Sequence, residues 1–281
     1  MTLKRFAAWV GVAVMMSYLG ACGYMWSTQK QLVFEPSPEI QSTPARLGMR
    51  FEELSIPVGS GGERAELHGW WVPAEQPGAV TILYLHGNYR NIGNSLDHTR
   101  RLHDLGYNVM LADYRGYGKS GGGAPSETKV YEDAEAAWQY LLNVRGVHPR
   151  RAFIYGHSLG GAIAIDLASR HPEAAGLITE STFTSMQAMG ELEYGYLPVG
   201  TLLNQRFDAL QKISGLKLPV LLIHGTLDQR IPVTMARQLY ASAPQPKALT
   251  LIEGGEHGNS GMIGWVEYRN AVSGFVGKYA H

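Results

Sequence analysis

The pentapeptide GHSLG at residues 156–160 places a serine between glycines, a spacing that can present a nucleophile. An apolar run, Ala152 to Tyr155, precedes it, and a helical stretch, Ala162 to Arg170, follows it. On such a strand-to-helix turn the hydroxyl projects above a sheet, and the glycines avoid the clash that a Cβ would cause. We therefore predict that Ser158 is a catalytic nucleophile rather than an incidental serine in a glycine-rich turn.

A serine hydroxyl becomes a strong nucleophile only when a base takes its proton, and a carboxylate orients that base. Asp228 follows the apolar run Val220 to Ile223, and His257 follows the run Ala248 to Ile252 through two glycines. Both lie in loops after strand candidates, in the chain order serine, acid, histidine. We predict His257 as the general base and Asp228 as the carboxylate that orients it.

The alternatives for these two residues are a surface carboxylate in a turn and a loop histidine. Asp208 competes poorly because it lies in an apparent helix, and His281 because it ends the chain. His224 is expected to make a local hydrogen bond at the end of a strand.

An acyl-transfer site also needs two N–H donors for the oxyanion. The N–H of Leu159, at the start of the helix after the serine, is the first candidate. HGN at residues 86–88 ends the strand candidate Val80 to Leu85, and we predict the N–H of Asn88 as the second donor. Gly87 lets the backbone approach the substrate, and His86 is expected to be structural.

Short apolar runs alternate with longer helical patterns, which predicts βαβ units around a mainly parallel sheet. A helix is expected after Ser126 to about Arg145, a second from Pro232, and a third from Met262 to Val276. The eight strand candidates are Glu52 to Ile56, Leu67 to Val72, Val80 to Leu85, Val109 to Ala112, Ala152 to Tyr155, Gly176 to Thr179, Val220 to Ile223 and Ala248 to Ile252.

The composition excludes several classes of protein. Among 281 residues, 24 basic side chains balance 24 acidic ones, so the formal net charge is zero and no nucleic-acid partner is expected. An apolar content of 45% supports a large core and excludes general disorder. The single cysteine excludes an intrachain disulfide framework and a cysteine-rich zinc module.

The N-terminal residues have the pattern of a targeting segment. Lys4 and Arg5 precede the apolar stretch Phe6 to Leu19, and the tetrapeptide LGAC ends at Cys22. This layout resembles a bacterial lipoprotein signal, in which the cysteine receives lipid, so residues 1–22 are predicted to be a signal peptide with Cys22 as the lipidation site. The alternative is an uncleaved anchor helix. Both predict a membrane-anchored protein of the cell envelope, with residues 23–50 as an extended lead-in.

With these motifs, residues 66–278 resemble the α/β-hydrolase superfamily, in particular its membrane-tethered serine hydrolases. HGN at 86–88, DYRGYGKSG at 113–121 and ESTFTS at 180–185 carry this resemblance, although relatives often have a proline where Thr182 stands. It implies an α/β-hydrolase fold with a mostly parallel eight-stranded sheet in residues 51–281, and an esterase, thioesterase or amide hydrolase that needs no metal or organic cofactor. Arg115 and Lys119 could meet an anionic headgroup, but a solvated loop is the simpler role for both.

The interval 181–218 between the sixth and seventh strands of the superfamily is the usual place for a lid, and it is short here. Its apolar residues could line an acyl pocket or simply pack together, as is common at helical spacing. They include Met186, Met189, Tyr194, Tyr196, Leu197, Phe207 and Leu210. A short lid predicts a fairly open site.

The sequence therefore predicts a membrane-tethered serine hydrolase that cleaves esters or thioesters of a small-molecule or lipid-like acyl substrate. A serine peptidase or amidase of the same fold is the first alternative, because the same triad cleaves amides. A catalytically inactive membrane-tethered scaffold is the second, and the presence of all three triad residues argues against it. The sequence does not predict the oligomeric state.

Overall fold

Eight strands form one sheet in the order β10-β9-β8-β7-β4-β6-β3-β2 in the computed structural model, which describes residues 2–59 and 61–280. Strand β3 runs antiparallel to both neighbours, β2 and β6, and the other adjacent pairs are parallel. The predicted mostly parallel sheet of the α/β-hydrolase fold is confirmed. Its strands are β2 (Glu52–Val58), β3 (Ala65–Val72), β4 (Thr81–Leu85), β6 (Asn108–Ala112), β7 (Ala152–His157), β8 (Gly176–Glu180), β9 (Val220–Gly225) and β10 (Lys247–Ile252).

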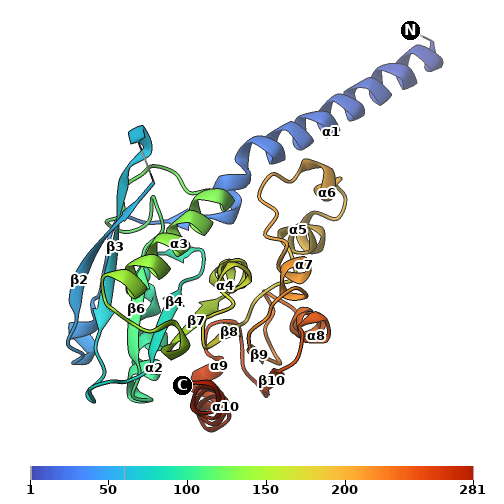
Figure 1. Cartoon of the computed structure of the whole chain (residues 1–281). Helices are drawn as coiled ribbons and strands as arrows, with labels where there is room; N and C mark the ends of the chain where they lie inside the picture. Colours follow the sequence, from blue (N-terminus) through green and yellow to red (C-terminus); the bar gives the residue numbers. More distant parts are fainter. Residues whose placement is uncertain (1, 60, 281) are drawn as a thin grey trace.

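Helices cover both faces of this sheet (Figure 1). Buried residues of α3, α4, α7 and α8 share one apolar core, and those of α2 and α10 share the core on the opposite face. The helices are α1 (Leu3–Val33), α2 (Leu96–Asp104), α3 (Glu127–Asn143), α4 (Leu159–Arg170), α5 (Met186–Tyr194), α6 (Val199–Leu202), α7 (Ala209–Ile213), α8 (Val233–Ser242), α9 (Ser260–Ile263) and α10 (Trp265–Tyr279).

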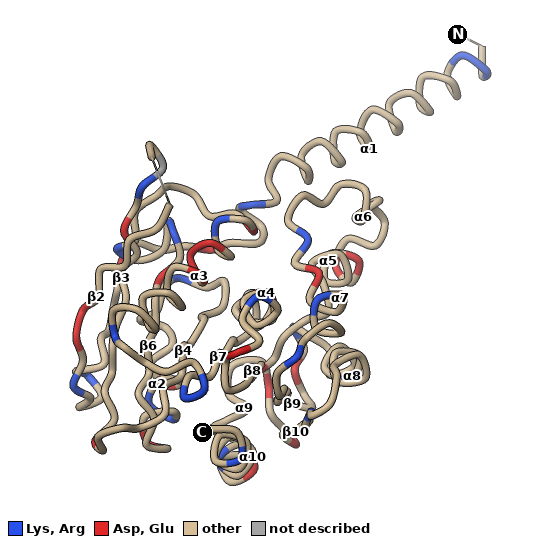
Figure 2. Tube along the Cα trace, viewed as in Figure 1, with Lys and Arg blue, Asp and Glu red and all other residues tan. Residues whose placement is uncertain are grey.

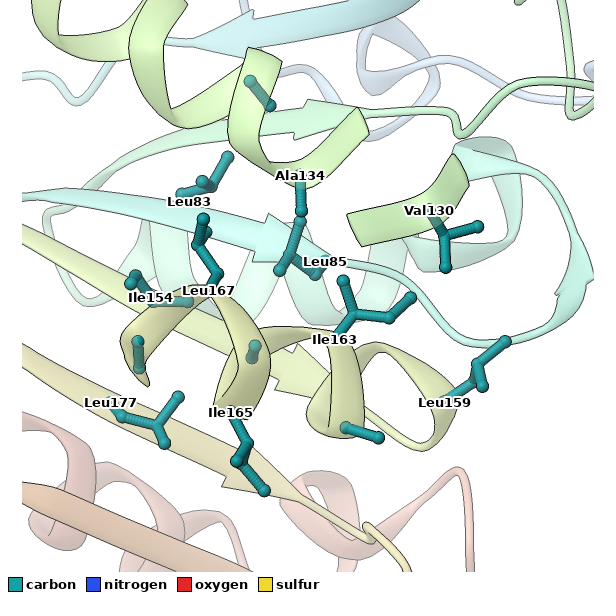
Figure 3. Close-up of a cluster of buried hydrophobic side chains, with 14 of the residues drawn as sticks. Leu83, Leu85, Val130, Ala134, Ile154, Leu159, Ile163, Ile165, Leu167 and Leu177 are labelled. Carbon is teal, nitrogen blue, oxygen red and sulfur yellow. The ribbon is translucent and has the colours of Figure 1, made fainter. Parts of the chain in front are cut away.

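The α3–α4 core fixes the helix that follows the predicted nucleophile. Leu83 and Leu85 point from β4 toward α3 and α4, while the intervening residue Tyr84 belongs to the opposite core, as the alternation of side chains along a strand requires. Ile163 and Leu167 of α4 are fully buried against them (Figure 3). Helix α4 therefore has little freedom to move relative to the centre of the sheet.

The structure differs from the predicted elements in three places. The extended lead-in expected from residue 23 begins only after Val33, because α1 continues to that residue and no helix-breaking proline occurs before Pro36. A small parallel sheet, β1 (Glu35–Pro36) with β5 (Tyr89–Arg90), was not expected. The C-terminal helix is interrupted at Gly264, which separates α9 from α10.

A buried ion pair anchors the loop DYRGYGKSG to helix α3. Arg115 is only 2% exposed, and its Nε donates to Asp133 Oδ1 of α3 at 2.6 Å. Its Nη2 donates to the exposed Glu132 at 2.6 Å. The solvated role predicted for Arg115 is therefore wrong, whereas Lys119 is exposed and pairs with Glu53 at 2.8 Å.

We expect Asp133→Ala to lower the free energy of unfolding by about 3–5 kcal/mol, because it leaves a buried guanidinium without its carboxylate. The matched control is Glu132→Ala, which removes an exposed partner of the same guanidinium and should cost roughly 0–1 kcal/mol. Chemical unfolding of the full chain in detergent micelles measures both. Equal losses in the two variants would contradict the anchoring role of the buried pair.

Candidate active site

Ser158 lies at the junction of β7 and α4 in a backbone conformation that few non-glycine residues adopt, with φ 55° and ψ −122°. The turn is so tight that a Cβ on Gly156 would lie 2.1 Å from the carbonyl oxygen of Gly160. A Cβ on Gly160 would lie 2.0 Å from the carbonyl oxygen of Leu85 in β4. The GHSLG glycines therefore allow β7, α4 and β4 to meet closely enough to present Ser158.

The structure brings the three predicted triad residues together. His257 Nε2 lies 3.0 Å from Ser158 Oγ, and His257 Nδ1 lies 2.9 Å from Asp228 Oδ2. Ser158 follows β7, Asp228 follows β9 and His257 follows β10. Because these strands are parallel, their carboxyl ends meet at one edge of the sheet and bring distant parts of the chain together.

Asp228 is held as a carboxylate by its donors. Its Oδ1 accepts backbone N–H groups of Arg230 and Ile231, both at 2.9 Å. Burial alone would raise the pKa of Asp228, but hydrogen bonds from His224, His257 and the Ile231 N–H hold that pKa well below its usual range. His224 Nε2 also donates to the Ile231 carbonyl at 2.8 Å, the local role expected for it.

The loop that carries Asn88 is held by two tyrosines of the DYRGYGKSG loop. The Tyr114 hydroxyl donates to the carbonyl of His86, and the Tyr117 hydroxyl donates to that of Asn88, each at 2.9 Å. A Cβ on Gly87 would lie 3.4 Å from Ser158 Cβ, so this loop runs beside the serine. The DYRGYGKSG motif, one of those that carry the family resemblance, therefore positions Asn88, the candidate oxyanion donor.

The two candidate donors have backbone N–H groups available beside Ser158. Among the hydrogen bonds of residues 2–59 and 61–280, neither the Asn88 N–H nor the Leu159 N–H has an acceptor. Asn88, Leu159, Ser158 and His257 all line one cleft. Such N–H groups can stabilise an oxyanion that forms on a substrate in this cleft.

His157, the residue before the serine, was not predicted to act in the site. Its Nε2 donates to the backbone carbonyl of His257 at 3.0 Å, so it links the nucleophile turn to the loop of the candidate base. Burial lowers the pKa of His157 to about 4, against the opposing effect of Glu180. The sequence contained one signal for this role, the position of His157 directly before the predicted nucleophile, from which its side chain can reach a neighbouring loop.

Beneath His157, the fully buried Glu180 at the end of β8 organises a polar network. Arg101 Nη2 lies 3.6 Å from Glu180 Oε1, and Tyr155 OH donates a hydrogen bond to the same carboxylate. Burial alone would raise the pKa of Glu180, but the Arg101 guanidinium, with its histidine and tyrosine neighbours, lowers that pKa to about 2. Glu180 is therefore ionised, and its backbone carbonyl accepts the Ser158 N–H at 2.9 Å.

Thr182, which stands where relatives often have a proline, forms a second link to the nucleophile. Its hydroxyl donates to the Ser158 carbonyl at 2.6 Å and is buried. A Cβ on Gly161 would meet this hydroxyl at 1.6 Å, so the loop after β8 packs directly on the start of α4. A proline could not make this bond because it carries no hydroxyl.

The cleft above the triad has a volume of about 820 Å³. Of the apolar residues predicted to line an acyl pocket, Met186, Met189 and Tyr194 line it. Phe207 is instead fully buried in the core, and Tyr196 is 72% exposed. The cleft lies within the size range of small-molecule sites, roughly 300–1,000 Å³.

A larger hollow of about 1220 Å³ lies between the β2–β3 strands and helices α3 and α4. None of the predicted site residues lines it, so it is separate from the chemistry described above. Cys22 lies on α1, partly exposed, and does not line the catalytic cleft. Within the described residues no group of three or more metal-ligating side chains is present.

Comparisons with known proteins agree with the α/β-hydrolase fold. A family model described as serine aminopeptidase, S33, matches residues 76–210. The chain is 31% identical to the uncharacterized protein Rv2307c of Mycobacterium tuberculosis, over 100% of this chain and 99% of the relative. It is 31% identical to the alpha/beta hydrolase domain-containing protein WAV2 of Arabidopsis thaliana, over 90% of this chain and 88% of the relative. The solved structure of the Pyrococcus furiosus esterase Pf2001 has the same fold, with a TM-score of 0.70 and 21% identity, over 89% of this chain and 99% of that one.

We expect Thr182→Val to lower the free energy of unfolding by about 0.5–1.5 kcal/mol, because the Ser158 carbonyl loses the Thr182 hydroxyl and keeps only the Gly161 N–H as a donor from outside the regular helix ladder. The methyl group of valine that replaces the hydroxyl would also lie too close to the Ser158 carbonyl oxygen. Thr184→Val is the matched control, since Thr184 is equally buried but its hydroxyl donates no hydrogen bond within the described residues. Chemical unfolding in detergent tests both variants, and similar losses would contradict a specific bond to the nucleophile turn.

His157 should make stability depend on pH. Its folded pKa, about 4, is below its ordinary value of 6.5, so its contribution is complete above pH 6.5 and is lost as pH falls toward 4. This shift corresponds to about 3 kcal/mol. His157→Gln should therefore flatten the decline of unfolding free energy over this window, although the buried His98 still contributes to it. Unfolding curves at several pH values measure the change, with the exposed His148→Gln as control, and an unaltered pH dependence in His157→Gln would contradict the assignment.

Proposed function

The chain belongs to the family of α/β-hydrolase domain-containing proteins, and we propose that it is a membrane-tethered serine hydrolase acting on esters or thioesters. The observation that carries this proposal is the continuous hydrogen-bonded chain from Asp228 through His257 to Ser158. The fold by itself accommodates many reactions, so the site rather than the fold supports the choice.

In the proposed acylation step, His257 Nε2 takes the proton of Ser158 Oγ as this oxygen bonds to the acyl carbon. The backbone N–H groups of Asn88 and Leu159 stabilise the negative charge that forms on the carbonyl oxygen. Asp228 holds the imidazole with Nε2 toward the serine and stabilises the imidazolium. The bond to the leaving oxygen or sulfur then breaks, and His257 returns the proton to the departing alcohol or thiol.

In the deacylation step, water replaces the leaving group. His257 takes a proton from this water, and the resulting hydroxide oxygen attacks the acyl carbon of the acyl-enzyme. The bond to Ser158 Oγ breaks, His257 returns its proton to the serine, and a carboxylic acid is released. The two steps require no group beyond the residues described and one water molecule.

Helix α1 supports the proposal of a membrane tether. No Lys, Arg, Asp or Glu occurs between Arg5 and Lys30 (Figure 2). None of residues 3–28 is buried. By length and composition α1 can cross a bilayer, although a signal sequence has the same properties. Lipidation of Cys22 remains part of the proposal, since it would hold the domain at a membrane after cleavage of the preceding residues.

A second candidate function is hydrolysis of amide bonds in substrates with a free amine. The matching family model is described as serine aminopeptidase, and two acidic side chains, Glu35 and Glu193, line the cleft. A carboxylate near the scissile bond can hold an ammonium group. Comparison of aminoacyl p-nitroanilides with p-nitrophenyl esters of similar size distinguishes the two functions.

We expect Ser158→Ala to abolish labelling by a fluorophosphonate probe and to lower kcat for p-nitrophenyl esters by about 10⁶-fold, because the triad acts as a unit. The matched control is Ser169→Ala, an exposed serine at the end of the same helix α4. Both assays use the purified full chain. Labelling that persists in Ser158→Ala, or a rate within about tenfold of wild type, would exclude Ser158 as the nucleophile, and an unlabelled wild-type chain would favour the scaffold alternative.

A further inference from the structure

The catalytic cleft has a wall made by the N-terminal helix. Met25, Gln29 and Leu32 of α1 line the same cleft as Ser158 and His257. Their spacing of four and three residues places them on one face of the helix. The hydrophobic segment of the chain therefore runs directly into the site.

The opposite wall is the segment between β8 and β9, residues 181–219, and it is also largely apolar. Met186, Met189, Leu192, Val199 and Leu202 of this segment line the cleft. Helix α6 of the segment packs against α1 (Figure 1). The cleft is therefore a channel between these two apolar walls, and Ser158 lies among its lining residues. We call the apolar part of this channel the apolar track.

Hydrogen bonds of a buried glutamine hold these two walls together. The Gln29 side chain is 3% exposed, and its Nε2 donates to the Leu202 carbonyl at 2.7 Å. Its Oε1 accepts the Asn204 N–H at 2.8 Å. Beyond the helix, the Glu35 N–H donates to the Asn88 carbonyl at 3.1 Å, so α1 is also connected to the candidate oxyanion loop. Its position at the cleft is therefore fixed by specific contacts.

The mouth of the cleft, lined by Met25 and the exposed Leu192, lies at the bilayer surface when α1 spans a membrane. A span that begins at Phe6 reaches Met25 after the ~30 Å of the hydrocarbon region, at 1.5 Å per residue. Tyr24 and Trp26 of α1 are 69% and 59% exposed at this level, and aromatic side chains prefer the membrane–water interface. Leu192, at the rim of the opposite wall, is 60% exposed.

The mouth of the cleft lies at the membrane surface in both predicted forms of the N-terminus, the uncleaved anchor helix and the chain cleaved before a lipidated Cys22. Every α1 residue that lines the cleft follows Cys22, so each remains after cleavage before a lipidated cysteine. Met25 lies only about 5 Å along the helix axis from Cys22. A lipid on Cys22 would hold the mouth of the cleft at the membrane surface as closely as a spanning helix does.

We propose that the substrate is an ester of a membrane-resident amphiphile, whose acyl chain enters between α1 and the 181–219 segment and reaches Ser158 without leaving the bilayer surface. This inference rests on the proposed serine-hydrolase function. The two apolar walls take the chain, and the ester carbonyl lies beside Ser158. Hydrolysis then gives a free fatty acid and the alcohol of the headgroup.

The test compares two esters with the same leaving group. The full chain is reconstituted in vesicles of ether-linked phosphatidylcholine. This lipid has no carboxylic ester bond, so it cannot itself be a substrate. The probes are 4-methylumbelliferyl palmitate in the bilayer and water-soluble 4-methylumbelliferyl butyrate. Leu32→Asp places a charge in the apolar track, and Gln31→Asp places the same charge on the neighbouring exposed position outside the cleft.

We expect wild type to cleave both esters, and Leu32→Asp to lower kcat/KM for the palmitate by at least about tenfold while changing the butyrate by less than about twofold, because a charge in the apolar track is costly to desolvate. Gln31→Asp should change neither. If Leu32→Asp lowers kcat/KM for both esters, the same measurement is made on Leu192→Asp, at the exposed rim. The proposal then requires this variant to lose activity on the palmitate and to keep it on the butyrate.

Two results would overturn the substrate class: hydrolysis of butyrate without palmitate by wild type, or the same selectivity in the Leu32 and Leu192 variants as in wild type. Failure of the serine-hydrolase function is a different result. In that case wild type cleaves neither ester and Ser158 is not labelled by the fluorophosphonate probe.

Discussion

The left-handed turn at Ser158 is the constraint on which the rest of the site depends. A non-glycine residue in such a conformation costs about 1–3 kcal/mol, so the surrounding contacts must hold it there. Two of them come from the end of β8 and the loop after it: the Glu180 carbonyl accepts the Ser158 N–H, and the Thr182 hydroxyl donates to the Ser158 carbonyl. The peptide groups on both sides of the nucleophile are thus fixed by β8 and the loop that follows it.

The charged network below the turn extends this constraint to the candidate base. Glu180 supports Ser158 through its backbone, while its carboxylate lies among Arg101, Tyr155 and His98, and His98 contacts His157. His157 in turn donates to the carbonyl of His257. A buried carboxylate needs its partners, and satisfying them orders the residues on either side of the reacting atoms. Serine and base are consequently positioned by the same cluster of polar contacts.

The segment after α1 joins the candidate oxyanion loop to the N-terminal helix. Glu35 pairs with Tyr89 in the small parallel sheet, and its N–H donates to the carbonyl of Asn88. The Tyr117 hydroxyl donates to the same carbonyl. The loop is therefore held both by the catalytic domain and by the residues that continue from α1. This connection explains how a helix that projects from the domain can still form a wall of its cleft.

The sequence by itself determined the strands of the main sheet and the residues that stand at their carboxyl ends. Apolar runs bounded by turn residues are local signals, so the eight strand candidates and the order of Ser158, Asp228 and His257 could be identified without coordinates. Only the tertiary structure decided the burial of Arg115 against α3, the bond from Thr182 to Ser158 and the place of α1 at the cleft. These depend on contacts between residues far apart in the chain, to which local periodicity and composition are blind.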